Sequence, residues 1–229
     1  MVMVSNQTGA KMAAVAQRYY PWGLFGHLYS PDGWREPMNC FPYALDNGAY
    51  AAYKRGAAWD GEAFLRHCDK AAAADQPPMW VVCPDVVADR AATLRQWDEW
   101  APRLRREYGW SLAFAVQDGM APVDVPGDHS LVFVGGTMTW KLNTLALWCG
   151  TFSRVHVARI NRVELLYRCQ ELGAESVDGT GWWHEDSGQW QGLCRWAAEQ
   201  TGETMRVVLQ SPFSGLFADT PLTRPPRRG

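Results

Sequence analysis

Short apolar runs alternate with amphipathic stretches along the 229 residues of the chain. The apolar runs are rich in β-branched and aromatic residues and are apolar on both faces, which is typical of strands buried within a parallel sheet. The predicted strands are residues 22–28, 43–47, 80–86, 111–117, 130–135, 154–160, 175–179 and 206–210. Eight strands with helices between them predict an α/β fold.

The amphipathic stretches predict helices at residues 60–73, 88–108, 161–172 and 189–200. In the second of these, Leu94, Trp97, Ala101 and Leu104 share one face. Asn161 is expected to begin the third as its N-terminal cap. Residues 119–128 have no helical pattern, so one crossover is predicted to be a loop. We therefore expect one domain over residues 1–229, a compact (β/α)8 TIM-like barrel, with residues 213–229 as a flexible basic tail. Periodicity alone leaves a doubly wound open sheet as the alternative.

Polar residues recur where the apolar runs end. They are Asp46, Asn47 and Gly48, then Asp85, Gln117, Gly135 and Gly136, then Arg159 and Asn161, and last Asp178. Any one of them could be a helix cap or a turn residue. In a parallel barrel, however, all these strand ends converge on one rim, which is where catalysis takes place in such folds. The succession therefore predicts one shared site.

The residue types at this rim suit chemistry at a glycosidic bond. One carboxylate can attack or stabilise the anomeric carbon while another transfers protons. A glycine pair lets the backbone approach a planar ligand closely. Aspartate and glutamine side chains can bind the edge of a purine. His156 lies within an apolar run, so we expect it to support the site or the core rather than to shuttle protons.

Charge and cysteine content limit the kinds of partner and bound group that we expect for this protein. The net charge of −2 gives no global attraction to nucleic acid, although 18 of the 22 basic residues are arginine, which binds phosphate in a bidentate manner. The six cysteines form no closely spaced pair, so we expect neither a metal site nor a redox motif. The chain has no apolar run long enough for a membrane span and no signal-peptide pattern, which predicts a cytoplasmic protein.

Four segments resemble motifs of the tRNA-guanine transglycosylases, in the same order along the chain. YALDNGAY from residue 43 looks like their DSGGF-type strand end, and FAVQDG from residue 114 looks like their VQGG segment. VFVGG from residue 132 resembles their GGL-type segment, and LGAESVDGT from residue 172 resembles the stretch that carries their nucleophilic aspartate. The forms DNGAY, PDVV, FVGGTMTWK and GAESVDGT are more similar to the DNA-directed branch of phages and bacteria. The resemblance covers residues 20–185.

This resemblance implies a transglycosylase that replaces guanine in DNA with a free 7-deazaguanine base such as 7-cyano-7-deazaguanine, in the host cytoplasm if a phage encodes it. Asp178 would be the nucleophile and Asp46 would transfer protons of the base. The base would be bound by Asn47, Gly48, Asp85, Gln117, Gly135 and Gly136. No cofactor is implied.

The chain departs from the enzymes that act on tRNA. After the nucleophile segment those enzymes carry a CxCxxC motif and a histidine that bind zinc, whereas this chain has GTGWWH and only Cys194 beyond it. We therefore expect no zinc subdomain and DNA rather than tRNA as the partner. The expected nucleic-acid contacts are Lys141, Arg159, Asn161, Arg162 and Trp182, together with the arginines of the tail. A hydrolase on the same barrel and a non-catalytic nucleic-acid-binding module remain alternatives.

Overall fold

The computed structural model describes residues 1–5, 18–19, 22–34, 41–183 and 188–202. Its strands are β1 (Val2–Ser5), β2 (Phe25–Tyr29), β3 (Tyr43–Leu45), β4 (Val81–Val82), β5 (Leu112–Val116), β6 (Leu131–Val134), β7 (Val155–Val157) and β8 (Ser176–Gly179). Its α-helices are α2 (Ala49–Arg55), α3 (Gly61–Ala72), α4 (Arg90–Tyr108), α5 (Met138–Thr151), α6 (Val163–Glu171) and α7 (Gln189–Thr201). Short 3-10 turns are η2 (Pro31–Gly33), η3 (Pro122–Asp124) and η4 (Gly181–Trp183).

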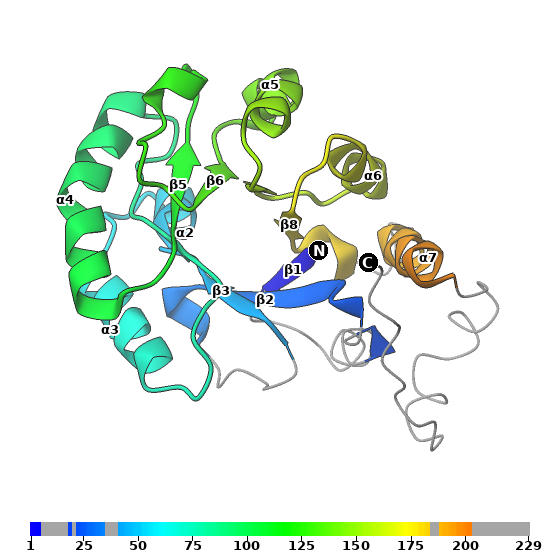
Figure 1. The fold of residues 1–229 in the computed structure, drawn as a ribbon, viewed down its shortest axis with the longest axis horizontal. Helices are drawn as coiled ribbons and strands as arrows, with labels where there is room; N and C mark the ends of the chain where they lie inside the picture. The colour runs from blue at the N-terminus through cyan, green and yellow to red at the C-terminus, as the bar shows by residue number, and fades with distance from the viewer. Residues whose placement is uncertain (6–17, 20–21, 35–40, 184–187, 203–229) are drawn as a thin grey trace.

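The strands form one barrel-shaped sheet in which every pairing is parallel. Each strand is hydrogen-bonded to the next in sequence, and β1 also pairs with β8, with Met3 opposite Asp178. Figure 1 shows α3 to α7 arranged around the outside of this sheet. All the carboxyl ends of the strands therefore lie at one end of the barrel, as in a TIM-like fold.

The prediction of an α/β fold with one parallel, barrel-shaped sheet is confirmed. The strands β2 to β8 coincide with seven predicted strands, and the doubly wound alternative is wrong because β1 joins β2 to β8. The strand predicted at residues 206–210 and the basic tail lie outside the described residues. The short strand β1 was not predicted. An α-helix follows each of β3, β4, β6, β7 and β8. Strand β5 instead leads into the predicted loop, which contains only η3.

Local sequence signals explain where most helices begin. Asp60, Asp89 and Thr137 each accept a hydrogen bond from a backbone N–H in the first turn of α3, α4 and α5. All four predicted helices are present as α3, α4, α6 and α7. Helix α5 was not predicted because its apolar residues do not form one stripe: Leu142 and Leu147 are exposed while others are buried.

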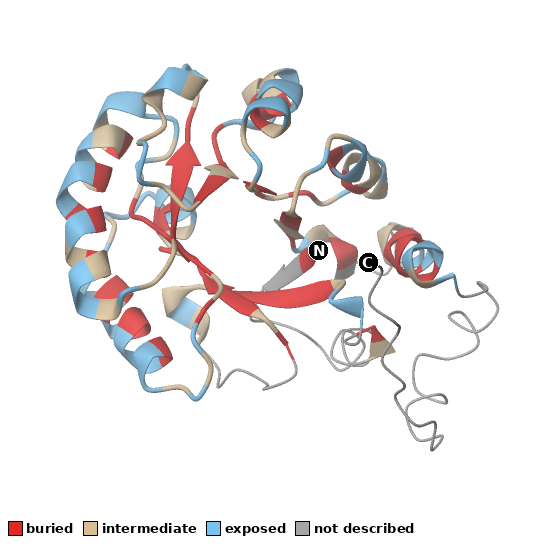
Figure 2. Ribbon diagram, viewed as in Figure 1, coloured by how far each residue is buried: buried red, intermediate tan, exposed pale blue. Residues whose placement is uncertain are grey.

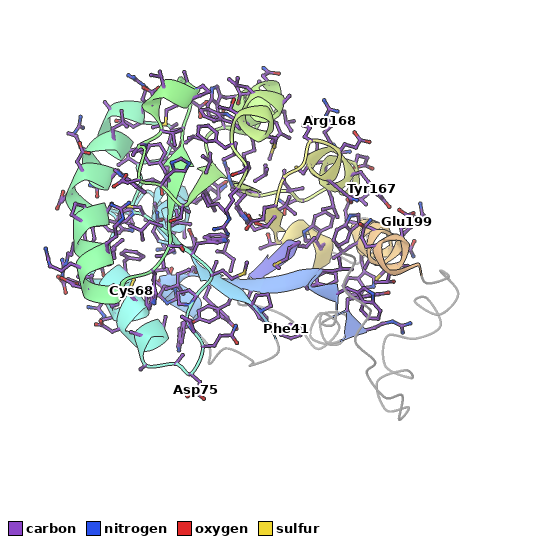
Figure 3. All side chains as sticks on the ribbon, viewed as in Figure 1. Phe41, Cys68, Asp75, Tyr167, Arg168 and Glu199 are labelled. Carbon is purple, nitrogen blue, oxygen red and sulfur yellow. The ribbon has the colours of Figure 1, made fainter. Side chains whose placement is uncertain are left out.

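Apolar side chains fill both faces of the sheet, and the strands are buried almost throughout (Figure 2). One cluster lies inside the barrel and is built from alternate strand residues such as Leu28, Ala44 and Val82, with Trp80 at its base. The larger cluster lies between the sheet and the helices. At the edge of this cluster, Tyr167 of α6 donates a hydrogen bond of 2.6 Å to Glu199 of α7; both residues are labelled in Figure 3.

Among the described residues, no helix is both long and apolar enough to cross a membrane.

Candidate active site

A pocket that is open on one side lies at the carboxyl ends of the strands. The predicted site residues that line it are Asp46, Asn47, Asp85, Gln117, Gly135, Gly136, Arg159 and Asp178. They come from the ends of β3, β4, β5, β6, β7 and β8. The prediction that Asp46 and Asp178 face one pocket is therefore confirmed, because parallel strands bring their carboxyl ends to the same rim.

Two amide side chains hold the carboxylate of Asp85. Asn47 Nδ2 donates to Asp85 Oδ1 at 2.6 Å, and Gln117 Nε2 donates to Asp85 Oδ2 at 2.7 Å. Gln117 is itself oriented, because its Oε1 accepts hydrogen bonds from the backbone N–H groups of Ala88 and Gly136. Burial raises the pKa of Asp85 to about 6 although the hydrogen bond from Asn47 favours the charged form. The result is a fixed carboxylate acceptor in the pocket wall.

Asp46 is the carboxyl group whose pKa is raised most clearly in the pocket. Burial comes first, followed by the negative charges of Asp178 and Asp85, and together they raise its pKa to about 7. Its oxygens accept hydrogen bonds from the backbone N–H groups of Asn47 and Gly48, which oppose the shift. A carboxyl group with this pKa can both donate and accept a proton near neutral pH.

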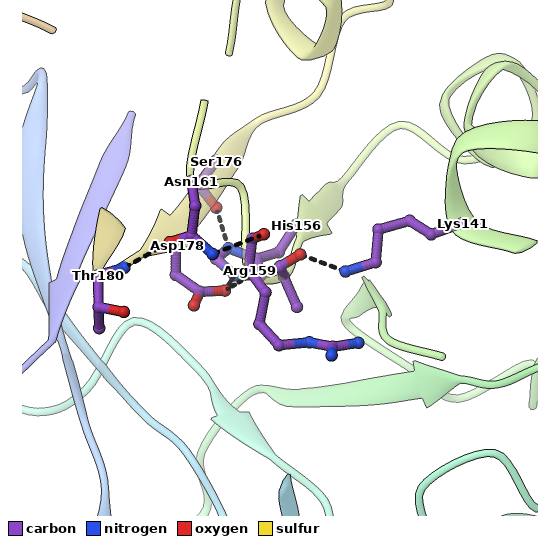
Figure 4. Close-up of polar contacts among 8 residues, drawn as sticks. Lys141, His156, Arg159, Asn161, Ser176, Asp178 and Thr180 are labelled. Atoms are coloured by element: carbon purple, nitrogen blue, oxygen red, sulfur yellow. Dashed lines mark hydrogen bonds and ion pairs between the residues drawn. The ribbon is translucent and has the colours of Figure 1, made fainter. Parts of the chain in front are cut away.

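Asp178 is held in place by contacts to its Oδ1 atom. His156 Nε2 donates to this oxygen at 3.0 Å, and the backbone N–H of Arg159 donates to it at 3.0 Å (Figure 4). The imidazole is fixed in turn, because its Nδ1 is hydrogen-bonded to Ser176 Oγ at 2.8 Å and its ring is stacked on Phe133. His156 thus supports the site from the barrel interior, as the sequence predicted.

Two residues beside the pocket have a strained backbone. Among the described residues, Ala88 and Arg159 are the non-glycine residues in the left-handed region, each with a φ of 58°. Such a conformation costs about 1–3 kcal/mol and is concentrated at functional sites. Both use the strained peptide to orient a site side chain, since Ala88 N–H donates to Gln117 and Arg159 N–H donates to Asp178. No sequence signal pointed to this role.

Two predicted nucleic-acid contacts are wrong for this structure. Lys141 is fully buried on the inner face of α5, where its Nζ donates to the carbonyl oxygen of Ala158. Burial, followed by the charge of Arg159, lowers the pKa of Lys141 to about 7. Trp182 is also fully buried, in the core that contacts α7. Neither side chain can reach a phosphate or a base, because each is enclosed by protein.

Asn161 makes a structural contact, and its predicted contact with nucleic acid stays a prediction. Its Oδ1 accepts hydrogen bonds from the backbone N–H groups of Thr180 and Gly181, at 2.8 and 2.7 Å, so it ties the segment after β7 to the segment after β8. It also does not cap α6, whose N-terminal cap is Arg162. Arg162 is exposed, so its contact with phosphate stays a prediction.

The pocket lining differs from the prediction at one predicted residue and at several residues that were not predicted. Gly48 does not line the pocket but begins α2 in a left-handed conformation with a φ of 79°. The apolar lining, from Leu28, Val87, Phe133 and Ala158, was not predicted as part of the site. Tyr50 also lines the pocket and is 37% exposed. Its place in the first turn after Asp46 could have indicated this.

The part of the chain that the structure describes contains no group of three or more histidine, cysteine or acidic side chains that could hold a metal ion. In comparisons with known proteins, no model of a protein family and no curated protein matches this chain.

Proposed function

We propose that this protein is a DNA base-exchange transglycosylase that replaces guanine with a 7-deazaguanine, on a TIM-like (β/α)8 barrel without a zinc subdomain. The observation that carries the proposal is the meeting of three carboxyl groups, Asp46, Asp85 and Asp178, in one pocket with three different environments. Glycosidic chemistry needs such a division between a nucleophile and a proton-transfer group. The motif resemblance supplies the substrate class.

Asp178 acts as the nucleophile. Its carboxylate oxygen bonds to C1′ of the target deoxyguanosine as the bond from C1′ to N9 of guanine breaks, which leaves a covalent sugar ester. His156 and the Arg159 N–H support this role because they fix the direction of the carboxylate. N9 of the incoming base then attacks the same carbon and releases Asp178. The two inversions retain the β configuration.

Asp46 moves the proton in both halves of the reaction. In its acid form it protonates guanine as the base leaves, and the resulting carboxylate then accepts the N9 proton of the incoming base. The pKa of about 7 supports this role, because both forms are present near neutral pH. The acid that is regenerated can begin the next turnover.

Asp85 and Gln117 bind the edge of the base. The oxygens of Asp85 are acceptors suited to the N–H groups of a guanine-type base, and the amides of Asn47 and Gln117 keep them in position. Gly135 and Gly136 line the same pocket and leave room for a flat ring. To reach this site, the target base must leave the DNA stack, which costs a few kcal/mol.

The test is exchange of labelled guanine or 7-cyano-7-deazaguanine into DNA, with tRNA as a parallel substrate. Asp178→Asn should abolish exchange because the anionic nucleophile is lost, while DNA binding is largely retained. Asp46→Asn should slow both halves of the reaction because the proton-transfer group is lost, but it retains the nucleophile, so a denaturing gel should still detect the covalent adduct. Asp128→Asn is the matched control, because this carboxylate precedes β6 at the opposite end of the barrel and pairs with Arg105.

Three results would contradict the proposal. Exchange at the wild-type rate by Asp178→Asn would refute the mechanism, and an adduct in that variant would assign the nucleophile to another residue. Preference for tRNA would refute the DNA substrate. Release of guanine without incorporation of a new base would instead identify a hydrolase on the same site.

A further inference from the structure

The side chain of Arg159 lies across the pocket. Its Cζ atom is 4.1 Å from the centroid of the Tyr50 ring, and its Nη2 atom donates a hydrogen bond to the carbonyl oxygen of Gly136. Tyr50 and Gly136 both line the pocket. Arg159 is the one cationic side chain among the described residues of this lining. A flat group rich in N–H donors is therefore stacked on an aromatic face inside the pocket.

The placement of this guanidinium follows from the backbone. Arg159 has a left-handed φ of 58°, and its own N–H is bound to Asp178 Oδ1. The preceding carbonyl, that of Ala158, is held by the buried Nζ of Lys141. The peptide group between Ala158 and Arg159 is thus fixed at both ends, at its carbonyl oxygen by Lys141 of α5 and at its N–H by Asp178 of β8 (Figure 4). The direction in which the side chain leaves the backbone is consequently set by these two contacts, one of which also orients Asp178.

The guanidinium also matches the proposed ligand chemically. It is planar and presents a fork of N–H donors around one carbon atom. The N1–H and 2-amino groups of guanine are arranged around C2 in the same way. Both can stack on the exposed face of Tyr50, and an N–H of the base that is not donated to Asp85 can be donated to the carbonyl of Gly136, as that of Arg159 is. The two groups therefore compete for one surface.

We propose that Arg159 occupies the base subsite as a substitute for the guanidine edge of a guanine-type base, and that the base enters by displacing it. This inference rests on the proposed function and adds to it a resident competitor for the base. Since the displaced contacts are the same for every ligand, Arg159 weakens the binding of all such bases by one common factor. A stacked cation and one hydrogen bond correspond to a factor of about 10.

Arg159→Gly is the informative variant. Glycine adopts a φ of 58° without strain and keeps the N–H that binds Asp178, so only the side chain is removed. Arg159→Lys keeps the charge but lacks the planar fork. Arg90→Ala is the control, because Arg90 is exposed and pairs with Asp124 outside the pocket. Urea unfolding confirms that each variant is folded.

Binding of labelled guanine and of hypoxanthine, which lacks the 2-amino group, is measured by equilibrium dialysis. We expect Arg159→Gly to bind both bases about 10-fold more tightly than the wild type, Arg159→Lys to bind them at least as tightly as the wild type, and Arg90→Ala to be unchanged. Equal or weaker binding by folded Arg159→Gly would overturn the inference, because Arg159 would then be a spectator or a direct contact of the base.

A second probe separates this inference from the proposed function. Methylguanidinium at millimolar concentration should bind Arg159→Gly saturably and should not bind the wild type, whose own guanidinium fills the place. If it does so while guanine binds no variant, the competitor role stands and the guanine proposal fails. If guanine binds all variants equally and methylguanidinium binds none, the guanine site stands and the competitor role fails. If neither probe binds any variant, both fail.

Discussion

Gly135→Ala tests whether close contact at the end of β6 shapes the pocket. A Cβ atom at this position would lie 2.9 Å from Gln117 Nε2 and 3.1 Å from the carbonyl oxygen of Val116. The carbonyl belongs to β5 and cannot move without disturbing the sheet. The Gln117 side chain can move, but it holds Asp85 and accepts a hydrogen bond from Gly136. Alanine must therefore displace Gln117.

The loss in free energy of unfolding caused by Gly135→Ala can be estimated in two ways. Forcing one extra carbon into a packed region costs about 1–3 kcal/mol. Relieving the clash by moving Gln117 instead removes its hydrogen bond to the carboxylate of Asp85, and a bond to a charged group contributes about 1.5–3 kcal/mol. Because these are two outcomes of the same clash, they are not added. We expect Gly135→Ala to lower the free energy of unfolding by about 1–3 kcal/mol.

Urea unfolding, followed by tryptophan fluorescence, measures this change. Gly150→Ala is the matched control, because Gly150 lies in α5, is exposed, and has no atom within 4 Å of an added Cβ. Alanine in place of glycine within a helix stabilises by up to about 1 kcal/mol. The same substitution should therefore have opposite signs at the two positions. Binding of labelled guanine should weaken in Gly135→Ala alone.

A Gly135→Ala protein that unfolds at the wild-type urea concentration and binds guanine normally would contradict this prediction. That result would mean that Gln117 can shift and still keep its hydrogen bond to Asp85. The hydrogen bonds around Asp85 would then not require a glycine at position 135.

Two predictions concern buried histidines. His27→Phe should make the protein less sensitive to acid. Burial lowers the pKa of His27 from 6.5 to about 4, so between these pH values the unfolded chain binds a proton that the folded chain does not bind. As the pH falls through this range, the wild type loses about 3 kcal/mol of unfolding free energy that the variant keeps. The raised pKa values of Asp46 and Asp85 act in the opposite direction but cancel between variant and wild type. Urea unfolding at pH 7 and 4.5 checks this, and equal pH dependence in both proteins would contradict it. His156→Phe removes a hydrogen-bond donor to Asp178 that contributes about 1.5–3 kcal/mol. Base exchange should therefore slow about 10- to 100-fold with little change in KM. Exchange at the wild-type rate would exclude a role for His156 in orienting Asp178.

The sequence by itself determined which residues meet at the rim. A residue that follows a buried parallel strand must lie at the carboxyl end of the sheet, whatever the details of closure. The order of apolar runs was therefore enough to bring Asp46, Asp85, Gln117 and Asp178 together. This prediction did not depend on β1, which is too short to be recognised as a strand from the sequence.

Only the tertiary structure decided which polar groups turn inward. Lys141 and Trp182 looked like surface contacts, yet both are buried, and the partner of Lys141 is a carbonyl oxygen 17 residues away. Helix α5 has no clear apolar stripe, so its sequence does not show which face meets the sheet. A buried amine is stable only where a specific acceptor meets it, and the chain far from the residue supplies that acceptor.

The same limit applies to the contacts that orient the site. The left-handed conformations of Ala88 and Arg159 carry no signature in their residue types, because packing imposes them on residues that do not favour them. The bond between His156 and Asp178 depends on the register of β7 against β8. Strand order is set by local hydrophobicity, whereas register, burial of polar groups and backbone strain are set by contacts between segments distant in sequence.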